Sequence, residues 1–157
     1  PASASWIPFP DVEFSFEADG ALVVRSPRVG PEAIRMEDAA QPLPGGRFRL
    51  MGRLDRIVKL EEKRISLPEL EAALEAHPWV KGAGVVRLEE PRPMLGAVIV
   101  LAEGVPAMER RQMGQALRRH LALSFEPVAI PKRWRLVAEL PYNERGKLTP
   151  QALAALF

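Results

Sequence analysis

The alternation of apolar and polar residues predicts a β-rich first third of the chain. In "VEFSFEADGALVVRSP" the alternation runs on both sides of Asp19-Gly20, a pair typical of a two-residue hairpin turn with positive φ at both positions. "GGRFRLMGRLD" predicts another hairpin arm, and the stretch "RVGPEAIRMEDAAQPLPGG" between them is predicted to be a loop. This third has too few apolar residues to close a core of its own, so we expect it to belong to a larger body.

The pattern changes at Asp55, where short strands and helices begin to alternate. "RIVKL" and "RISL" are predicted strands around the turn "EEK". Ser66 and Glu69 form a capping box, S-x-x-E, with Pro68 in the first turn of the helix that follows. That helix is predicted to end before Pro78 and to carry its apolar face on Leu67, Leu70, Ala73 and Leu74.

The remaining segments complete a compact α+β unit. "VKGAGVVRL", "LGAVIVLA" and "KRWRLVAEL" are predicted strands. A long helix is predicted to begin at Pro106, with Met113, Leu117 and Leu121 at a spacing of four, and Thr149-Pro150 to cap a final short helix. The expected fold class is therefore α+β: a β-rich segment followed by a compact α/β domain with a short hairpin, a central three-stranded sheet and flanking helices.

Composition excludes several classes of function. The 157 residues include no cysteine, so disulfides, a thiol nucleophile and a Cys-ligated metal site are excluded. A net charge of +2 does not point to nucleic acid. No apolar run approaches the ~20 residues that span a membrane, and "PASASWIPFP" lacks the features of a signal peptide. We expect a cytoplasmic protein without a membrane span.

Lys147, in "LPYNERGKLTPQAL", is the first candidate for chemistry. A Gly-Lys pair ahead of a helix is reminiscent of phosphate-binding loops, but a Walker loop requires G-x-x-x-x-G-K-[ST]. Here Leu148 follows the lysine and Gly146 is the loop's single glycine. The loop cannot surround a phosphate by itself. Lys147 is therefore either a solvated loop lysine or a lysine delivered to a phosphate that another domain holds.

Other charged groups have ordinary interpretations when taken alone. The charges of "MGRLDRIVKLEEKRISLPELE" are consistent with the polar face of a hairpin. His77 and His120 lack a metal-ligand or nucleophile partner at a useful spacing, and we expect structural roles for them. The arginine pairs 110–111 and 118–119 indicate a solvated helix face or a contact with an acidic carrier protein.

Two stretches together resemble the signature motifs of the adenylate-forming superfamily, which comprises acyl-CoA synthetases, peptide-synthetase adenylation domains and luciferases. That family carries a G-R-x-D hinge motif, then I/V-K-x-x-G-x-R-I and an E-[IL]-E helix, and much later L-P-x-x-x-x-G-K. The matching positions here are Gly52-Arg53-Leu54-Asp55, Val58-Lys59, Arg64-Ile65, Glu69-Leu70-Glu71, Leu140-Pro141 and Gly146-Lys147. The resemblance covers essentially the whole chain, which is identified as a member of the family.

The resemblance implies a role for each motif. Asp38 falls where the family has T-G-D, although its neighbours Met36 and Glu37 depart from that pattern. Asp38 is expected to hold the ribose hydroxyls of ATP or AMP, and Arg53 to contact the same nucleotide. Asp55 is the expected hinge, and Lys147 the expected catalytic lysine of adenylation.

The hairpin motif departs from the family at one position. Lys59, Glu62 and Arg64 belong to the hairpin that lines the pantetheine channel in the thioester-forming state, and Glu62 stands where the family usually has Gly. Glu adds bulk and negative charge where the backbone approaches a ligand, so either the acceptor enters differently or the hairpin is shifted. "EEKRISLPELE" resembles ligases of bacterial fatty-acid-like and aryl-polyene biosynthesis, which implies an acyl carrier protein as acceptor.

The family implies an organisation and a reaction for the whole protein. Residues 1–54 are expected to be the end of an N-terminal adenylation body, in a β-barrel subdomain, with most of the body preceding Pro1. Residues 55–157 are expected to be a mobile C-terminal lid. The reaction is activation of a carboxylic acid with ATP and Mg²⁺, followed by transfer of the acyl group to CoA or phosphopantetheine. This fragment alone is expected to be inactive.

Two alternatives come from other functional classes. The chain could be a non-catalytic lid-like module that binds a carrier or partner protein. It could also bind nucleic acid through "KRWR" and the arginine-rich helix, but it lacks a known motif and a concentrated basic stripe for this.

Overall fold

The computed structural model describes residues 5–105 and 110–157. Contacts divide the chain into two compact units, the first ending at Ile57 and the second running from Val58 to Phe157. The predicted division after residue 54 concerns the parent domains of the whole protein and stays a prediction. The predicted start of the long helix at Pro106 lies outside the described residues. Within those residues, the helices are all too short or too polar to cross a membrane.

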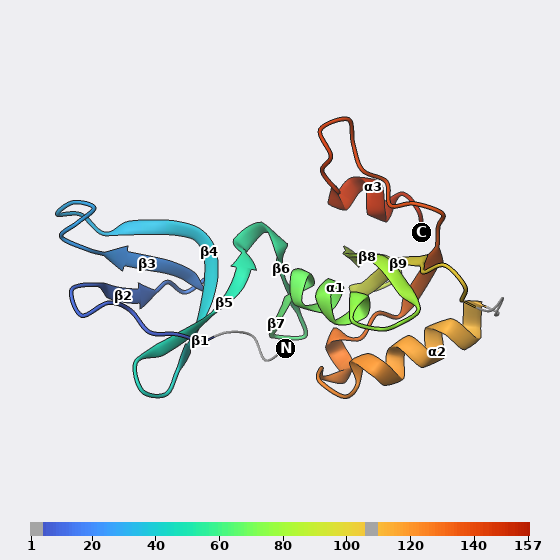
Figure 1. Cartoon of the computed structure of the whole chain (residues 1–157), viewed down its shortest axis with the longest axis horizontal. Coiled ribbons are helices and arrows are strands. Elements are labelled where there is room, and N and C mark those ends of the chain that lie inside the picture. Colours follow the sequence, from blue (N-terminus) through green and yellow to red (C-terminus); the bar gives the residue numbers. More distant parts are fainter. Residues whose placement is uncertain (1–4, 106–109) are drawn as a thin grey trace. The chain divides into compact units, whose positions relative to one another are not determined.

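The first unit is a five-stranded antiparallel sheet of order β1-β5-β4-β3-β2, drawn in blue to green in Figure 1. Its strands are β1 (Ser5–Trp6), β2 (Glu13–Phe16), β3 (Ala21–Arg25), β4 (Ile34–Leu43) and β5 (Arg47–Arg53). A 3₁₀ turn, η1 (Leu54–Arg56), follows β5. The two predicted hairpin regions are confirmed as strands.

Two predictions for this unit are wrong. The predicted loop at residues 28–46 contains the ten-residue strand β4, which pairs with both β3 and β5. Pro42 lies beyond the last residue pair that β4 makes with β3, Ala21 with Ala39, so its missing N–H interrupts no ladder on that side. The turn after β2 has positive φ at Gly20 but not at Asp19, whose carboxylate instead accepts a hydrogen bond from the Ala21 N–H at 2.9 Å.

Apolar side chains are exposed on this sheet unit, as its predicted lack of a closed core suggests. Seven of the nine large exposed hydrophobic residues of the described chain belong to it: Trp6, Ile7, Phe9, Val29, Ile34, Met36 and Leu50. Such a sheet face gains stability when other structure covers it.

The second unit contains the predicted three-stranded sheet and hairpin. Its order is β10-β9-β8, with β8 and β9 antiparallel and β10 parallel to β9. The elements are β6 (Ile57–Leu60), β7 (Lys63–Ser66), α1 (Leu67–Glu75), β8 (Val80–Leu88), β9 (Met94–Leu101), α2 (Arg110–Leu121), η2 (Pro127–Ala129), β10 (Arg133–Leu136) and α3 (Pro150–Ala154). Strands β6 and β7 pair as a separate two-stranded sheet.

Two hydrophobic clusters cover the two faces of the β8–β9 pair. On one face, α1 and α2 bury Leu70, Leu74, Met113 and Leu117 against the sheet. On the other face Leu153 of α3 is fully buried among residues that include Val86 and Val98. Figure 1 shows α2 and α3 on opposite sides of the sheet. The predicted capping box is confirmed, because the Ser66 hydroxyl accepts a hydrogen bond from the Glu69 N–H at 3.3 Å.

Candidate functional site

The loop that carries Lys147 is fastened to the second hydrophobic cluster at both ends. Leu140 is buried in the cluster and Leu148 packs against it. Tyr142 and Leu148 form an isolated antiparallel bridge that closes the base of the loop. Between these anchors the Lys147 residue is exposed, and its ammonium group makes no ion pair with any other described residue. The fold thus presents a free cation from a fixed base.

Glycines in β8 allow the loop and α3 to approach the sheet. A Cβ added at Gly84 would lie 2.7 Å from Leu153 Cδ2 and 3.1 Å from Leu148 Cδ2. The Thr149 hydroxyl caps α3 by accepting a hydrogen bond from the Ala152 N–H at 3.2 Å, as the sequence predicts. The close approach therefore fixes the end of the loop from which Lys147 projects.

The β6–β7 hairpin has an acidic two-residue turn in the left-handed region. Glu61 and Glu62 have φ of 45° and 64°, the combination of a type I′ turn that normally favours Asn or Gly. Lys59 Nζ lies 2.7 Å from a Glu62 carboxylate oxygen, and Lys63 Nζ lies 3.2 Å from Glu126. Both lysines of the predicted pantetheine-channel hairpin are therefore engaged by carboxylates.

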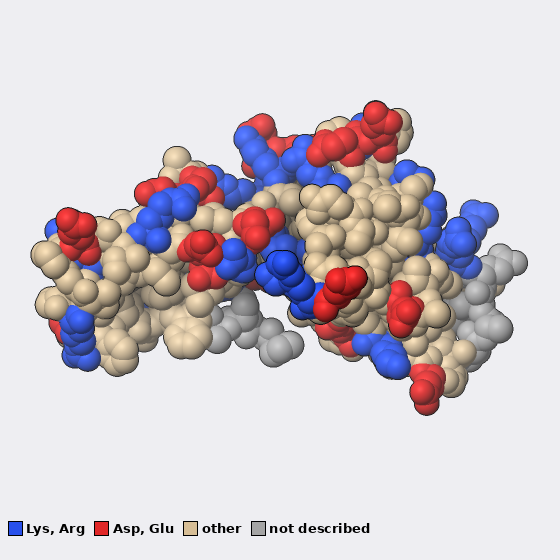
Figure 2. Space-filling model, turned by 90° about the horizontal axis from the view of Figure 1, so that it is seen from above, with Lys and Arg blue, Asp and Glu red and all other residues tan. Residues whose placement is uncertain are grey.

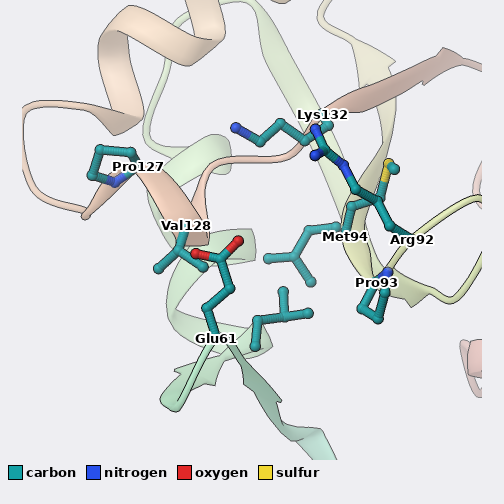
Figure 3. A pocket seen from close by; sticks show the side chains of 9 residues that line it. Glu61, Arg92, Pro93, Met94, Pro127, Val128 and Lys132 are labelled. Carbon is teal, nitrogen blue, oxygen red and sulfur yellow. The ribbon is translucent and has the colours of Figure 1, made fainter.

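A pocket of about 170 Å³ lies beside this turn (Figure 3). Arg92 and Lys132 approach it from one side and Glu61 from the other. Apolar side chains complete the lining: Leu60, Pro93, Met94, Leu95, Pro127 and Val128. The site thus combines two cations and one carboxylate with an apolar wall, which suits a ligand that has an anionic group next to an uncharged chain.

The predicted nucleotide-binding residues lie opposite each other in the first unit. Asp38 of β4 and Arg53 of β5 are register partners. The Arg53 guanidinium lies 2.9 Å from the Glu37 carboxylate and 3.2 Å from that of Asp55, the predicted hinge. Asp55 chiefly, and Glu37 to a smaller extent, raise the pKa of Arg53. Arg53 therefore stays charged, and in this state two carboxylates hold it.

The structure brings these residues together in two groups. Asp38, Arg53 and Asp55 are gathered at one end of the first unit's sheet. Lys59, Glu62, Arg64 and Lys147 belong to the second unit, where the hairpin and the Lys147 loop are separate features. Within the described residues no group of three or more His, Cys, Asp or Glu is placed to hold a metal ion.

Sequence reasoning missed three residues. Arg92 and Lys132 stand outside the recognised motifs and enter the pocket only because the β8–β9 connection and the segment before β10 fold toward the hairpin. Asn143 accepts two backbone hydrogen bonds inside the Lys147 loop. A signal for Asn143 was available in the sequence, because the side chain of Asn in a loop commonly hydrogen-bonds the backbone two residues on.

Three of the residues that suggested nucleic-acid binding, Arg118, Arg133 and Arg135, have local partners. Arg133 and Arg135 both donate to the Phe157 carbonyl, at 2.9 and 3.3 Å, and both guanidinium groups lie over the Phe157 ring. Arg118 donates to the Lys132 carbonyl at 2.8 Å. On the face shown in Figure 2, acidic side chains are interspersed with basic ones. "KRWR" therefore acts in part as a structural clamp.

The two histidines, for which the sequence predicts structural roles, contact each other. Their ring centroids are 5.0 Å apart. His77 Nδ1 accepts the Trp79 N–H at 3.2 Å, and His120 Nε2 lies 2.8 Å from the Ala73 carbonyl oxygen. Burial, and then the neighbouring His120, lower the pKa of His77.

Comparison with solved structures identifies the fold. The amide bond synthetase McbA from Marinactinospora thermotolerans aligns with a TM-score of 0.73 at 22% identity, covering 96% of this chain and 36% of that protein. O-succinylbenzoate coenzyme A synthetase from Bacillus subtilis, in complex with AMP, aligns with a TM-score of 0.71 at 21% identity, covering 92% of this chain and 34% of the synthetase.

Comparison with protein sequences agrees. The malpinin synthetase of Mortierella alpina is 35% identical over 133 residues, 80% of this chain and 2% of that protein. The acetyl-coenzyme A synthetase of Pyrobaculum arsenaticum is 33% identical over 132 residues, 82% of this chain. The chain spans 18% of that synthetase's length. The profile described as "AMP-binding enzyme C-terminal domain" matches residues 69–147, half of the chain. The chain therefore belongs to the AMP-binding enzyme C-terminal domain family of the adenylate-forming ligases.

Proposed function

We propose that the protein to which this chain belongs is an AMP-forming ligase that activates a carboxylic acid and transfers it to a thiol. In the first half-reaction the carboxylate attacks the α-phosphate of ATP, giving acyl-adenylate and pyrophosphate. In the second, a thiol attacks the acyl carbon and AMP leaves. The observation that carries the proposal is the fixed loop that presents Lys147 as a free cation, combined with the family membership.

Lys147 serves the first half-reaction in this proposal. Negative charge accumulates on the phosphate oxygens as the carboxylate attacks, and an ammonium on a four-carbon stem can neutralise it. Asp38 and Arg53, opposite each other on β4 and β5, hold the nucleotide. Arg53 must first exchange Glu37 or Asp55 for that ligand.

In this proposal Mg²⁺ accompanies ATP, held mainly by the phosphates and by the N-terminal body of the full-length protein. When bound, the ion offsets the charge of the triphosphate. The B. subtilis O-succinylbenzoate coenzyme A synthetase has been solved with ATP and magnesium ion, which supports both as reactants in this family.

The β6–β7 hairpin and its pocket serve the second half-reaction. Lys59 and Arg64 belong to the hairpin strands, and Arg92 and Lys132 place two cations in the adjoining pocket. A phosphopantetheine arm has the matching chemistry, a phosphate joined to a mostly uncharged chain that ends in a thiol. We propose that Glu62 disfavours free CoA and that an acyl carrier protein delivers this arm, in fatty-acid-like or polyene metabolism in the cytoplasm.

The test is a product assay on the full-length protein. With ATP, Mg²⁺ and a panel of fatty and aryl acids, the proposal predicts pyrophosphate release that depends on the acid. Stoichiometric AMP should then appear when a phosphopantetheinylated carrier protein is added. If the protein binds the carrier but forms neither acyl-adenylate nor AMP with any acid, the non-catalytic module is the correct description.

A further inference from the structure

Asn143 organises the backbone of the Lys147 loop from within. Its side-chain Oδ1 accepts hydrogen bonds from the Arg145 N–H at 3.0 Å and the Lys147 N–H at 2.9 Å. Its backbone N–H donates to the Lys147 carbonyl at 2.9 Å, and its carbonyl accepts from the Gly146 N–H at 2.8 Å. Each of Asn143 and Lys147 thus donates a hydrogen bond to the other. Asn143 takes part in all four bonds.

The two backbone bonds can be made by any residue at position 143, but the two side-chain bonds cannot. A side chain without an acceptor would leave the Arg145 and Lys147 N–H groups to water. Residues 142–147 are all exposed, and the hydrophobic anchors of the loop, Leu140 and Leu148, lie outside them. The Asn143 amide is therefore what defines the conformation of the loop between its anchors.

We propose that Asn143 is a positioning residue that sets where the Lys147 ammonium acts during adenylation. The inference rests on the proposed function, in which Lys147 meets the reacting phosphate. The four-carbon stem of lysine is flexible, and no described ion pair holds Lys147. The position of its ammonium group therefore depends on the position and direction of its Cα.

The expected effect follows from the geometry of reaction. A misplacement of about 1 Å at a reacting group can cost about 10²-fold in rate. Asn143 does not contact the substrate in this account, so its loss should lower kcat for adenylation by about 10- to 10²-fold. The KM for ATP should not change, because the nucleotide is held elsewhere. Thioester formation from preformed acyl-adenylate should also be unaffected.

The experiment compares four variants of the full-length protein. Asn143→Leu keeps the side-chain size and removes the acceptor. Asn143→Thr keeps an oxygen that can make the same kind of turn more weakly. Glu144→Leu is the matched control, because the structure gives the Glu144 side chain no role in the loop's hydrogen bonds. Lys147→Ala is the reference for complete loss of the cation. For each variant we would measure single-turnover adenylation, the KM for ATP and the second half-reaction.

The inference predicts that adenylation is slow in Asn143→Leu, intermediate in Asn143→Thr and normal in Glu144→Leu, with KM and the second half-reaction unchanged. Normal adenylation in Asn143→Leu together with slow adenylation in Lys147→Ala would overturn the inference and leave the proposed function intact. Equal losses in both half-reactions would show a general structural role and also overturn it. Normal adenylation in Lys147→Ala would instead contradict the proposed function.

Discussion

Glu62 occupies a backbone conformation that suits glycine. Its φ of 64° lies in the left-handed region, where a residue with a Cβ is about 1–2 kcal/mol less stable. The Gly of the family motif would suit this turn, whereas Glu62 is destabilised in it. The ion pair of Glu62 with Lys59 is exposed and compensates little of it.

Replacing Glu62 by Gly should relieve the turn and open the hairpin. We expect the free energy of unfolding of this chain to rise by about 1 kcal/mol, because the left-handed conformation no longer carries a Cβ penalty. In the full-length protein, thioester formation with free CoA should increase while adenylation is unchanged. Glu62→Ala is the matched control, since it removes the carboxylate but keeps the strained Cβ. If CoA use is the same in Glu62→Gly and wild type, the hairpin does not restrict the acceptor.

His77 makes stability depend on pH in the second unit. Burial and His120 lower its pKa below the ordinary value of about 6.5. The unfolded chain therefore binds a proton at a higher pH than the folded chain does. The sign follows from linkage: stability is unaffected well above the ordinary pKa and falls as pH drops from there toward the lowered folded value.

Denaturant unfolding at about pH 7.5 and about pH 5.5 can measure this effect. Wild type should lose more stability on acidification than His77→Gln. His120→Gln should fall between them, because it removes the smaller cause and leaves the burial. An equal pH dependence in wild type and His77→Gln would show that His77 does not contribute to the pH dependence of stability.

At the scale of elements, residues close together in sequence define most of the second unit, and its elements were predicted well. Pairing between distant strands defines the first unit, and its prediction was less complete. The Ser66 and Thr149 caps, the apolar face of α1 and the β6–β7 turn depend on residues near in sequence, and the structure confirms them. Strand β4 was missed because Pro and Gly obscure its pattern and its pairing partners β3 and β5 define it. The pocket at Arg92 and Lys132 was missed for the same reason, since three distant segments build it.

The packing of α3 on β8 gives a prediction with a built-in control. Gly84→Ala should place a Cβ 2.7 Å from Leu153 and so displace α3, at a cost of about 1–3 kcal/mol typical of overpacking. Gly82 lies on the same strand and face. A Cβ added there would lie 3.5 Å from its nearest neighbour, Leu140 Cδ1, so Gly82→Ala should be tolerated. Thermal or denaturant unfolding of both variants measures the difference. Equal stabilities would contradict the close approach of α3.

At the scale of the whole molecule, the chain covers a small part of the ligases that it resembles. We propose that it acts as a lid that completes two sites in turn by rotating about a hinge. Asp55 lies in the η1 turn, two residues before the first unit ends at Ile57. Rotation requires backbone freedom at this turn.

Asp55→Pro should restrict that freedom. Proline fixes φ near −65° and disfavours the helical conformation that Leu54 adopts before it. The full-length variant should retain one half-reaction and lose the other, whereas Asp55→Ala, which removes only the contact with Arg53, should retain both. If Asp55→Pro lowers both half-reactions equally, or neither, the hinge lies elsewhere.

The most direct test of the central claim is to measure the two half-reactions separately in full-length Lys147→Ala. We expect adenylation to fall by about 10²–10³-fold, the loss typical of removing one charge-stabilising group. Thioester formation from preformed acyl-adenylate should remain near the wild-type rate, because the hairpin and not Lys147 then serves the site. Adenylation at the wild-type rate would contradict the account and leave Lys147 as a solvated loop lysine.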